Sequence, residues 1–470
     1  DKWDPRSYAK DFDFERPFIE QMKEFLISVP KIALYLSLGY GENVNSEYVN
    51  MASGCKNCYL VFNTGPAEET LYSRGLRNSM DSSDLYFGFA IDRCYESINI
   101  QESNGVTHGQ NVVSCVDSHF LLNCSGLINC FGCVNLRNKS NCFLNEQLSK
   151  DEYNKRVSEI MGSSERMAQF RKEFDEFALK FPRRENNNLQ SVDSTGDYLS
   201  ECKNVKDSFE ILKSEDCRYT FSSKLIKDSI GTIGYGTNCE RLLECVAVGY
   251  STNIVGTYGA ENCQNILYGF YTSNCNDCVG CDALKNGSFA VFNKEYSKEE
   301  YEEIKSHIVS ELKDQDLYGL IMPPALAPFA YNETVAQDNF PLTKEEAIGQ
   351  GFRWEDDIQQ TRGKETIHSD DIPDHINDVL DSITHEVLRC DSCERNYRIT
   401  DAEFLFYRKM KLPIPRICFY CRHQDRILRR GPYKFWDRKC DNCSKDIITN
   451  YSPDRSEIVY CESCYQKEVM

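Results

Sequence analysis

The residues best suited to a defined chemistry are eight cysteines near the end of the chain. They form four CxxC pairs: Cys390/Cys393, Cys418/Cys421, Cys440/Cys443 and Cys461/Cys464. Two thiolates separated by two residues lie on one tight turn, and two such turns complete the tetrahedral sulfur shell that Zn²⁺ accepts. The pattern predicts two zinc ions in closed four-thiolate sites, which hold a fold together and leave no open position for a substrate.

The spacing between the pairs is typical of zinc ribbons. Seventeen residues separate Cys443 from Cys461, and 24 separate Cys393 from Cys418. Because only 18 residues separate Cys421 from Cys440, a shifted or interleaved pairing of the four CxxC units stays open. Disulfides and free buried thiols are the alternatives to zinc.

Basic and aromatic residues are interleaved around the two inner CxxC pairs. The aromatic residues are Phe419, Tyr420, Tyr433, Phe435 and Trp436. Cations neutralise phosphates and aromatic faces stack on unpaired bases, so this surface predicts contact with RNA or a ribonucleoprotein. The alternatives are a solvated basic surface and a surface that docks on an acidic part of the same chain. The basic candidates are Arg416, Arg422, His423, Arg426, Arg429, Arg430, Lys434, Arg438 and Lys439.

Charge is distributed unevenly along the 470 residues. Residues 389–470 carry 17 Lys and Arg against 12 Asp and Glu, a net charge of +5, whereas residues 1–388 carry a net charge of −24. An acidic body with a basic end is typical of proteins that contact nucleic acid at that end. No run approaches the length of a membrane span, and the CxxC spacing favours a reduced, cytoplasmic protein.

Cysteines also recur at regular steps in the body of the chain. Cys115, Cys124, Cys133 and Cys142 are nine residues apart, and Cys245, Cys263 and Cys281 are eighteen apart. A fixed step of this kind predicts a β-solenoid of about 18 residues per coil, in which cysteine is a small inward hydrophobe. Asn precedes many of these cysteines, and Asn suits solenoid corners because it tolerates a left-handed backbone.

A longer repeat relates residues 130–153 to residues 278–301 at an offset of 148. The paired positions include Cys133/Cys281, Gly132/Gly280 and Asn145/Asn293. In both copies a strand and a turn precede a helix that begins at Ser149 or Ser297, with Glu three residues later in the capping-box position. The chain therefore predicts two copies of one solenoid unit.

The predicted fold class is mainly β: a two-unit β-solenoid with helical connectors and C-terminal tandem zinc ribbons. Gly162-Ser163-Ser164 is expected to break the helical connector, and Thr343 to cap a short helix. The predicted segments are 1–40 (N-terminal segment and capping helix), 41–148 (solenoid unit 1), 149–190 (helical connector), 191–293 (solenoid unit 2), 294–388 (helix and irregular linker), 389–431 (zinc ribbon 1) and 432–470 (zinc ribbon 2).

Several whole stretches, among them DKWDPRSYAKDFDFERPF, PLTKEEAIGQGFRW, IPRICFYCRHQDRILRR and DRKCDNCSKDIITNYSPDRSEIVYCESCY, resemble a family of proteins from metagenomic candidate-phyla bacteria. Members of that family look like cysteine-rich repeat proteins flanked by zinc ribbons, often with a further ribbon before the equivalent of Asp1. The resemblance covers nearly the whole chain and implies a domain plan but no activity. Some members are labelled coenzyme A transferases, but this chain has no nucleotide-binding glycine loop and no α/β alternation.

Three other groups of residues could in principle take part in chemistry: the remaining CxxC units, the histidines and a set of carboxylates. Cys55/Cys58, Cys130/Cys133 and Cys275/Cys278/Cys281 are expected to be stacked core thiols, because a ferredoxin-like motif would need a cysteine where Lys285 stands. None of the seven histidines belongs to a catalytic motif. Five carboxylates of the first predicted solenoid unit are candidates for a carbohydrate-type acid/base site: Glu68, Glu69, Asp81, Asp84 and Asp92.

The favoured function is thus a non-enzymatic zinc-binding scaffold whose basic ribbon module contacts RNA. A carbohydrate-active enzyme and a purely protein-docking scaffold are the alternatives.

Overall fold

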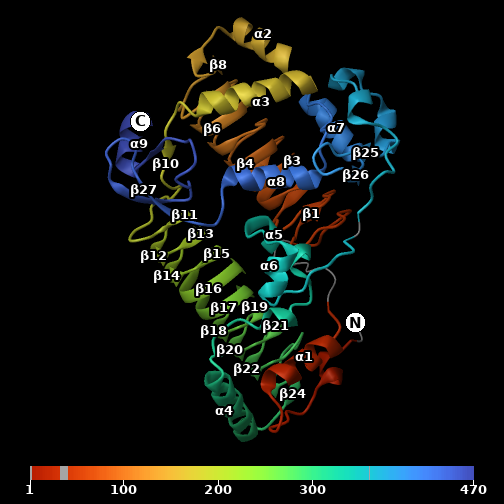
Figure 1. Cartoon of the computed structure of the whole chain (residues 1–470), viewed down its shortest axis with the longest axis vertical. Coiled ribbons are helices and arrows are strands. Elements are labelled where there is room, and N and C mark those ends of the chain that lie inside the picture. The colour runs from red at the N-terminus through yellow and green to blue at the C-terminus, as the bar shows by residue number, and fades with distance from the viewer. Residues whose placement is uncertain (1–2, 32–40, 359, 470) are drawn as a thin grey trace. The chain divides into compact units, whose positions relative to one another are not determined.

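The computed structural model describes residues 3–31, 41–358 and 360–469 (Figure 1). The fold is mainly β and divides into two compact units, each built around one large sheet. Unit 1 comprises Asp1–Lys31, Arg184–Asp356 and Tyr433–Arg455, and unit 2 comprises Ile32–Arg183, Asp357–Pro432 and Ser456–Met470. Within the described residues, no helix is both long and apolar enough to cross a membrane.

Strands of the unit 2 sheet pair in chain order, and the first eight are parallel. Partners are twelve residues apart along the whole stack, as in Ser83 with Tyr95 and Ile98 with Gln110. The strands are β1 (Cys55–Lys56), β2 (Ala67–Leu71), β3 (Arg74–Asp92), β4 (Tyr95–Gln101), β5 (Gln110–Val113), β6 (His119–Ser125), β7 (Phe131–Val134), β8 (Cys142–Phe143) and β9 (Glu146–Gln147).

The unit 1 sheet follows the same rule, with a step of twelve between most partners, such as Ile254 with Ile266. A single inserted residue makes the step thirteen between β16 and β17. The strands are β11 (Gly196–Ser200), β12 (Lys203–Lys206), β13 (Ser208–Leu212), β14 (Glu215–Arg218), β15 (Phe221–Lys224), β16 (Ile226–Tyr235), β17 (Cys239–Gly249), β18 (Thr252–Val255), β19 (Tyr258–Glu261), β20 (Gln264–Leu267), β21 (Phe270–Ser273), β22 (Asn276–Val279), β23 (Ser288–Val291) and β24 (Lys294–Glu295).

This register corrects the predicted step of about 18 residues. Nearly every third residue from Asn45 to Leu144 has a positive φ angle, and the residue after it points inward. Cysteines occupy such inward positions, so their separations are multiples of three. Steps of nine and eighteen satisfy that rule without being the distance between paired strands. The expectation that Asn fits these positions is confirmed, because Asn123, Asn129 and Asn141 all have positive φ.

The inward-pointing thiols of the two sheets form hydrogen bonds with backbone carbonyl oxygens. Cys124 Sγ lies 3.3 Å from the carbonyl oxygens of Leu122 and Cys133, and Cys245 Sγ lies 3.2 Å from Leu243 O and 3.4 Å from Ile254 O. Each of these thiols therefore meets a carbonyl two residues before it and another nine residues after it. No disulfide is formed by any of the 24 cysteines, all of which lie in the described part of the chain. The described sheet cysteines form no cluster suited to a metal ion.

Both parallel stacks end in the same way. A short antiparallel pair closes each sheet: β8 with β9, and β23 with β24. Asn145 accepts a hydrogen bond from Val134 N and donates one to Val134 O, while Asn293 makes the same two bonds with Asp282. These bonds are 148 residues apart, the offset read from the sequence. They explain why Asn stands at both positions.

Helices of unit 2 pack on one face of its sheet, with α3 over β6 and with α7 and α8 over β3 and β4 (Figure 1). The predicted break in the connector is confirmed, because α2 ends at Ile160 and Ser163 caps α3. The elements are α2 (Lys150–Ile160), α3 (Ser164–Ala178), η4 (Ser369–Asp371), η5 (Ile376–Asp378), η6 (Asp381–His385), β25 (Leu388–Arg389), β26 (Asn396–Tyr397), α7 (Asp401–Met410), α8 (Phe419–Arg430) and α9 (Glu462–Val469); β10 (Arg183–Arg184) pairs with β29 (Val459–Tyr460).

In unit 1, α1 packs on the closing end of the sheet, where Phe18 and Phe25 contact Phe292. Helix α1 ends at Ser28, before Pro30, and residues 32–40 of the predicted N-terminal segment lie outside the described part. The capping boxes at Ser297 and Thr343 are confirmed, whereas Ser149 caps α2 without the reciprocal bond because Glu152 binds Arg156. The elements are η1 (Pro5–Tyr8), α1 (Phe18–Ser28), α4 (Lys298–Asp314), η2 (Pro324–Leu326), η3 (Tyr331–Glu333), α5 (Ala336–Asn339), α6 (Lys344–Gly349), β27 (Trp436–Lys439) and β28 (Asp446–Thr449).

Candidate metal centre and the helix that follows it

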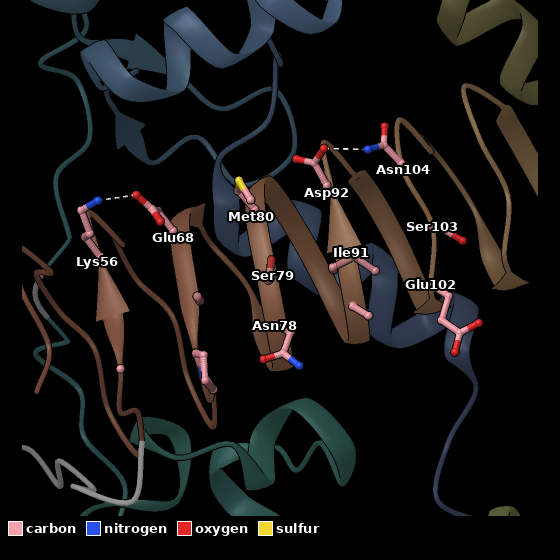
Figure 2. Close-up of a pocket in the computed structure, with 14 residues that line it drawn as sticks. Lys56, Glu68, Asn78, Ser79, Met80, Ile91, Asp92, Glu102, Ser103 and Asn104 are labelled. Atoms are coloured by element: carbon pink, nitrogen blue, oxygen red, sulfur yellow. Dashed lines mark hydrogen bonds and ion pairs between the residues drawn. The ribbon is translucent and has the colours of Figure 1, made fainter. Parts of the chain in front are cut away.

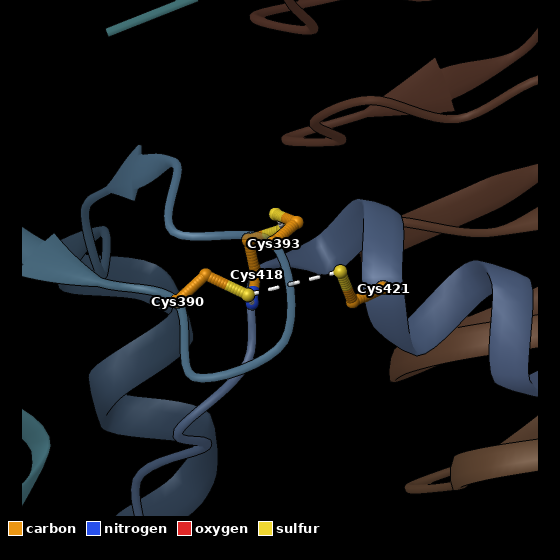
Figure 3. Close-up of side chains that lie close together, drawn as sticks. All are labelled: Cys390, Cys393, Cys418 and Cys421. Atoms are coloured by element: carbon orange, nitrogen blue, oxygen red, sulfur yellow. Dashed lines mark hydrogen bonds between the residues drawn. The ribbon is translucent and has the colours of Figure 1, made fainter. Parts of the chain in front are cut away.

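The first two CxxC pairs come together in unit 2. The sulfur atoms of Cys390, Cys393, Cys418 and Cys421 all lie within 4.8 Å of one another (Figure 3). Cys390 Sγ is 3.7 Å from Cys421 Sγ, and Cys393 Sγ is 3.7 Å from Cys418 Sγ. Sulfurs bound at about 2.3 Å to a tetrahedral ion are about 3.8 Å apart, so the four thiols fit a zinc shell and are too far apart for disulfides.

Local structure brings the two pairs into position. Cys390 and Cys393 lie on the turn between β25 and β26, where Glu394 N donates to Cys390 O and Glu394 has a φ of 62°. Cys418 is the N-cap residue of α8, and Cys421 lies in its first turn. The Cys418 amide donates to Cys390 Sγ at 3.2 Å. Burial raises the pKa of Cys390, but amide donors, Cys418 N first, outweigh it and lower that pKa to about 7, which favours the thiolate that a metal needs.

The second group consists of Cys440, Cys443, Cys461 and Cys464, whose sulfur atoms also lie within 4.8 Å of one another. Its first pair repeats the turn of the first group: Ser444 N donates to Cys440 O, and Ser444 has a φ of 60°. Pairing is therefore sequential in both groups. Two four-cysteine clusters are present, as the sequence predicts.

Helix α8 continues directly from the first cluster and places three arginines on one face. Arg422, Arg426 and Arg430 are four residues apart, and only 3%, 0% and 5% of their surfaces are exposed. Leu428, on the opposite face, is 74% exposed. The helix therefore turns its charged side toward the sheet, the reverse of a usual surface helix.

Carboxylates of unit 2 receive these arginines. Arg422 Nε donates to Asp84 Oδ1 at 3.0 Å, and Arg426 Nη1 lies 3.1 Å from the same oxygen. Arg426 also pairs with Glu96, whose second oxygen accepts from Arg429 Nη2 at 3.0 Å. Asp84 and Glu96 are one twelve-residue step apart.

Two further residues complete the network. Glu403 of α7 accepts from Arg422 Nη2 at 3.3 Å, from Tyr407 Oη at 2.6 Å and from Tyr72 Oη at 2.9 Å. Arg430 Nη1 donates to Tyr86 Oη at 2.6 Å. Nε and Nη2 of Arg426 have no hydrogen-bond partner among the described residues. The network is thus dense but leaves one buried guanidinium partly unsatisfied.

Burial and the guanidinium charges oppose each other in this network. Burial raises the pKa of Asp84, but Arg422 and Arg426 outweigh it and hold that pKa below its usual range. Burial dominates at Glu96 and Glu403 and raises the pKa of both carboxyls. Asp84 is therefore the carboxylate that the arginines hold in its charged form.

The other residues predicted to contact RNA are placed as follows. Arg416 donates to the carbonyls of Ser369, Ile372 and Pro373, and Arg438 donates to Ser452 O. His423 is half-buried near Tyr86. Lys434 and Lys439 are exposed, and Lys439 pairs with Asp446 at 2.7 Å. Of the nine residues predicted to contact RNA, only these two lysines are exposed.

A shallow groove of about 630 Å³ crosses the unit 2 sheet (Figure 2). Its lining repeats at the twelve-residue step and includes Glu68, Asp92, Glu102, Asn78 and Met80. Lys56 pairs with Glu68, and Asn104 donates to Asp92 at 2.7 Å. Two of the five carboxylates proposed from the sequence therefore lie here. The other three carboxylates make contacts outside the groove: Glu69 accepts a hydrogen bond from Asn57, Asp81 pairs with Lys409, and Asp84 pairs with Arg422 of α8.

Sequence reasoning missed Glu96, Glu403 and the three tyrosines of the arginine network. The helical step from Arg422 to Arg426 to Arg430 was a usable signal, because it puts three cations on one face. Glu403 was detectable only as a capping-box residue after Thr400. Nothing near Glu96 in the sequence points to α8.

Comparisons with known proteins add little. No family model and no curated protein matches the chain. Among solved structures, a crystal structure from Desulfovibrio desulfuricans G20 described as a candidate acetyltransferase is 9% identical, covering 63% of this chain and 90% of the other, with a TM-score of 0.11. That score is too low to support any common fold.

Proposed function

We propose that this protein is a non-enzymatic, zinc-stabilised scaffold that functions by binding other molecules in a reducing, cytoplasmic setting. The observation that carries the proposal is the closed four-thiolate geometry at Cys390, Cys393, Cys418 and Cys421. A tetrahedral ion with four sulfur ligands has no open position for substrate or water, so it stabilises structure. The lack of disulfides among the 24 described cysteines is consistent with a reducing compartment.

Metal analysis of the purified chain tests the zinc assignment. We expect about two zinc equivalents per chain, with one lost in Cys393→Ser and one in Cys443→Ser. Cys245→Ser, in the core of unit 1, is the matched control and should keep both equivalents. Zinc content near zero in the wild type would contradict the proposal.

The platform of the scaffold is proposed to be two copies of a β-solenoid unit with twelve residues per coil. Support comes from the register of twelve between most paired strands, the spacing of positive φ angles and the matched closing bonds of Asn145 and Asn293. Deleting residues 252–263 removes one full coil and should leave a folded chain, because the strands on either side stay in register. Deleting nine residues, 252–260, should abolish cooperative unfolding; equal behaviour of the two deletions would contradict a twelve-residue coil.

Contact with RNA remains a prediction, and all six of the arginines predicted to make it are bonded within the chain. It would depend on exposed Lys434 and Lys439. A filter-binding titration with single-stranded RNA at several salt concentrations tests it, since phosphate contacts give salt-dependent affinity. Lys434→Ala with Lys439→Ala should then reduce binding. Absence of binding by the wild type would leave a protein-docking scaffold as the better assignment.

The groove of unit 2 favours a second candidate, a carbohydrate-type site. Glu68 and Asp92 are two steps of twelve apart, or about 9.5 Å, the upper end of the separation of carboxylates in inverting glycosidases. A screen of linear oligosaccharides for binding and hydrolysis tests this candidate. Glu68→Gln and Asp92→Asn should each abolish hydrolysis, whereas Glu69→Gln, outside the groove, should not.

A further inference from the structure

We propose that the carboxylates beneath α8 form an acceptor surface for an arginine-bearing helix, and that the first thiolate cluster decides whether α8 occupies it. The inference rests on the proposed zinc site. It adds an interaction surface and a partner class that the scaffold assignment does not contain. The acceptor surface is defined by Asp84, Glu96 and Glu403, with the tyrosines Tyr72 and Tyr86.

The shape and charge of this surface match a helix with arginines at every fourth position. Asp84 and Glu96 lie on successive coils, about 4.8 Å apart, while residues four apart on a helix rise about 6 Å. One carboxylate can therefore serve two neighbouring arginines, as Asp84 serves Arg422 and Arg426. Tyr86 accepts from Arg430 and extends the match to a third turn.

The first thiolate cluster is linked directly, through the start of α8, to the contact between Arg422 and Asp84. Cys418 caps α8, Cys421 lies in its first turn, and Arg422 is the next residue. The partners of Cys418 and Cys421 are Cys393 and Cys390, on the turn between β25 and β26. An ion bound to all four sulfurs fixes the start of the helix and hence the position of Arg422 over Asp84.

Charge pairing alone holds α8 weakly. Arg426 is fully buried, yet its Nε and Nη2 atoms lack hydrogen-bond partners among the described residues. Burial of a charged group with unsatisfied donors opposes docking, and desolvation of Asp84 and Glu96 adds to that cost. Metal binding at the first cluster therefore supplies the free energy that keeps α8 docked. Loss of the metal should release α8 and expose the acceptor surface.

The first experiment measures hydrogen exchange in the full-length wild type and in Cys393→Ser, whose substitution lies outside α8. We expect exchange of amides in residues 419–430 to rise by on the order of tenfold, while β6 and β7 keep their protection. Chelation of the wild type should give the same change, and added zinc should reverse it. Cys443→Ser, in the second cluster, should leave α8 protected.

The second experiment uses a synthetic peptide of residues 416–432 carrying Cys418→Ser and Cys421→Ser. It should bind the Cys393→Ser chain at least about tenfold more tightly than the wild type, whose surface α8 already occupies. Asp84→Asn in the Cys393→Ser background should abolish that binding.

The outcomes separate the two claims. A wild type without metal overturns the proposed function. If the wild type contains metal but α8 stays protected after the metal is removed, the claim that the first cluster controls α8 is overturned and the proposed function is not. Peptide binding that is equal in wild type and Cys393→Ser, or absent from both, overturns the acceptor surface.

Discussion

Backbone conformation decides which residues stand at every third position of the two sheets. These positions have positive φ, which Gly and Asn tolerate best. Gly132 is one of them, with a φ of +68°. A Cβ atom there would lie 2.8 Å from Phe170 Cζ, a contact closer than real Cβ atoms make. Helix α3 can therefore approach the sheet only because residue 132 has no side chain.

Gly132→Ala should destabilise the protein by about 2–4 kcal/mol, from backbone strain and from overpacking against Phe170. Gly234→Ala is the matched control, because Gly234 has a φ of +74° with nothing within 4 Å of the added Cβ. Gly234→Ala should lower the free energy of unfolding by about 1–2 kcal/mol, the cost of backbone strain alone. Chemical denaturation measures both; equal losses would mean that α3 does not press on Gly132.

A second residue-scale effect concerns Asp282. Its side chain is fully buried, Lys31 pairs with one oxygen, and Oδ1 has no partner among the described residues. Burial outweighs Lys31 and raises the pKa of this carboxyl to about 6. Because the folded pKa exceeds the unfolded one, the native state holds the proton more tightly.

The stability from Asp282 should be fully present below about pH 4, the unfolded pKa, and lost as pH rises through about 6. Between pH 4.5 and 7.5 this amounts to about 2 kcal/mol. Urea titrations at the two pH values should show this loss in the wild type, and a smaller one in Asp282→Asn, which cannot ionise. An equal pH response in both chains would show that Asp282 titrates normally.

At the scale of elements, α8 departs from the usual rule for surface helices. Its arginines face the strands and Leu428 faces outward. Local hydrophobic patterning predicts the opposite orientation, because isolated charges avoid burial. The inversion is possible because three carboxylates from β3, β4 and α7 meet three guanidinium groups.

Arg426→Ala should destabilise unit 2 by about 3–5 kcal/mol, because it removes the buried guanidinium that bridges Asp84 and Glu96 and leaves each carboxylate with a single arginine partner. Lys434→Ala removes an exposed cation and should change stability by no more than about 0.5 kcal/mol. Denaturant unfolding compares the two. A loss below about 1 kcal/mol for Arg426→Ala would indicate that the arginine network is solvated.

At the scale of the whole molecule, cysteine has two separate roles. Sixteen of the 24 cysteines lie on the strands of the two sheets or on the turns between those strands, where their thiols meet backbone carbonyls, and eight form the two clusters. Burial raises the pKa of sheet thiols such as Cys115 and Cys239 to about 11. A hydrogen bond with Cys133 lowers the pKa of Cys130 to about 7, and one with Cys55 lowers the pKa of Cys58. All sixteen side chains are nevertheless buried, so they should be unreactive while the sheets are folded.

A thiol titration should therefore proceed in two steps. Chelation at neutral pH should expose about eight thiols to an alkylating reagent, and the other sixteen should react only in denaturant. Mass spectrometry of the alkylated peptides identifies which cysteines react at each step. Reaction of sheet cysteines before the cluster cysteines would contradict the assignment of roles.

Much of this architecture was predictable from local sequence. Four CxxC pairs indicated two thiolate clusters, and Asn before cysteine indicated left-handed corners. Ser163 after Gly162 marked the break between α2 and α3. Each of these features depends on residues close together in the chain, whose geometry is set by the backbone and a few side chains.

The step between paired strands was not predictable from cysteine spacing. Cysteine can fill any inward position, so its spacing reports the three-residue step between positive-φ residues and not the twelve-residue step between paired strands. Asn145 and Asn293 show the same limit: the repeat revealed that they correspond, but only the structure shows the carbonyl and amide they bind.

Sequence by itself determined that eight cysteines lie in pairs whose spacing suits a metal ion, that the body is mainly β and that a basic segment follows an acidic one. Tertiary structure alone decided what the basic segment does, because Arg422 and Asp84 are 338 residues apart in the chain. Whether an arginine meets phosphate, water or a carboxylate depends on what folding places beside it. Here folding places Asp84 and Glu96 beneath α8, and three of the arginines that suggested an RNA surface, Arg422, Arg426 and Arg430, are buried within the protein.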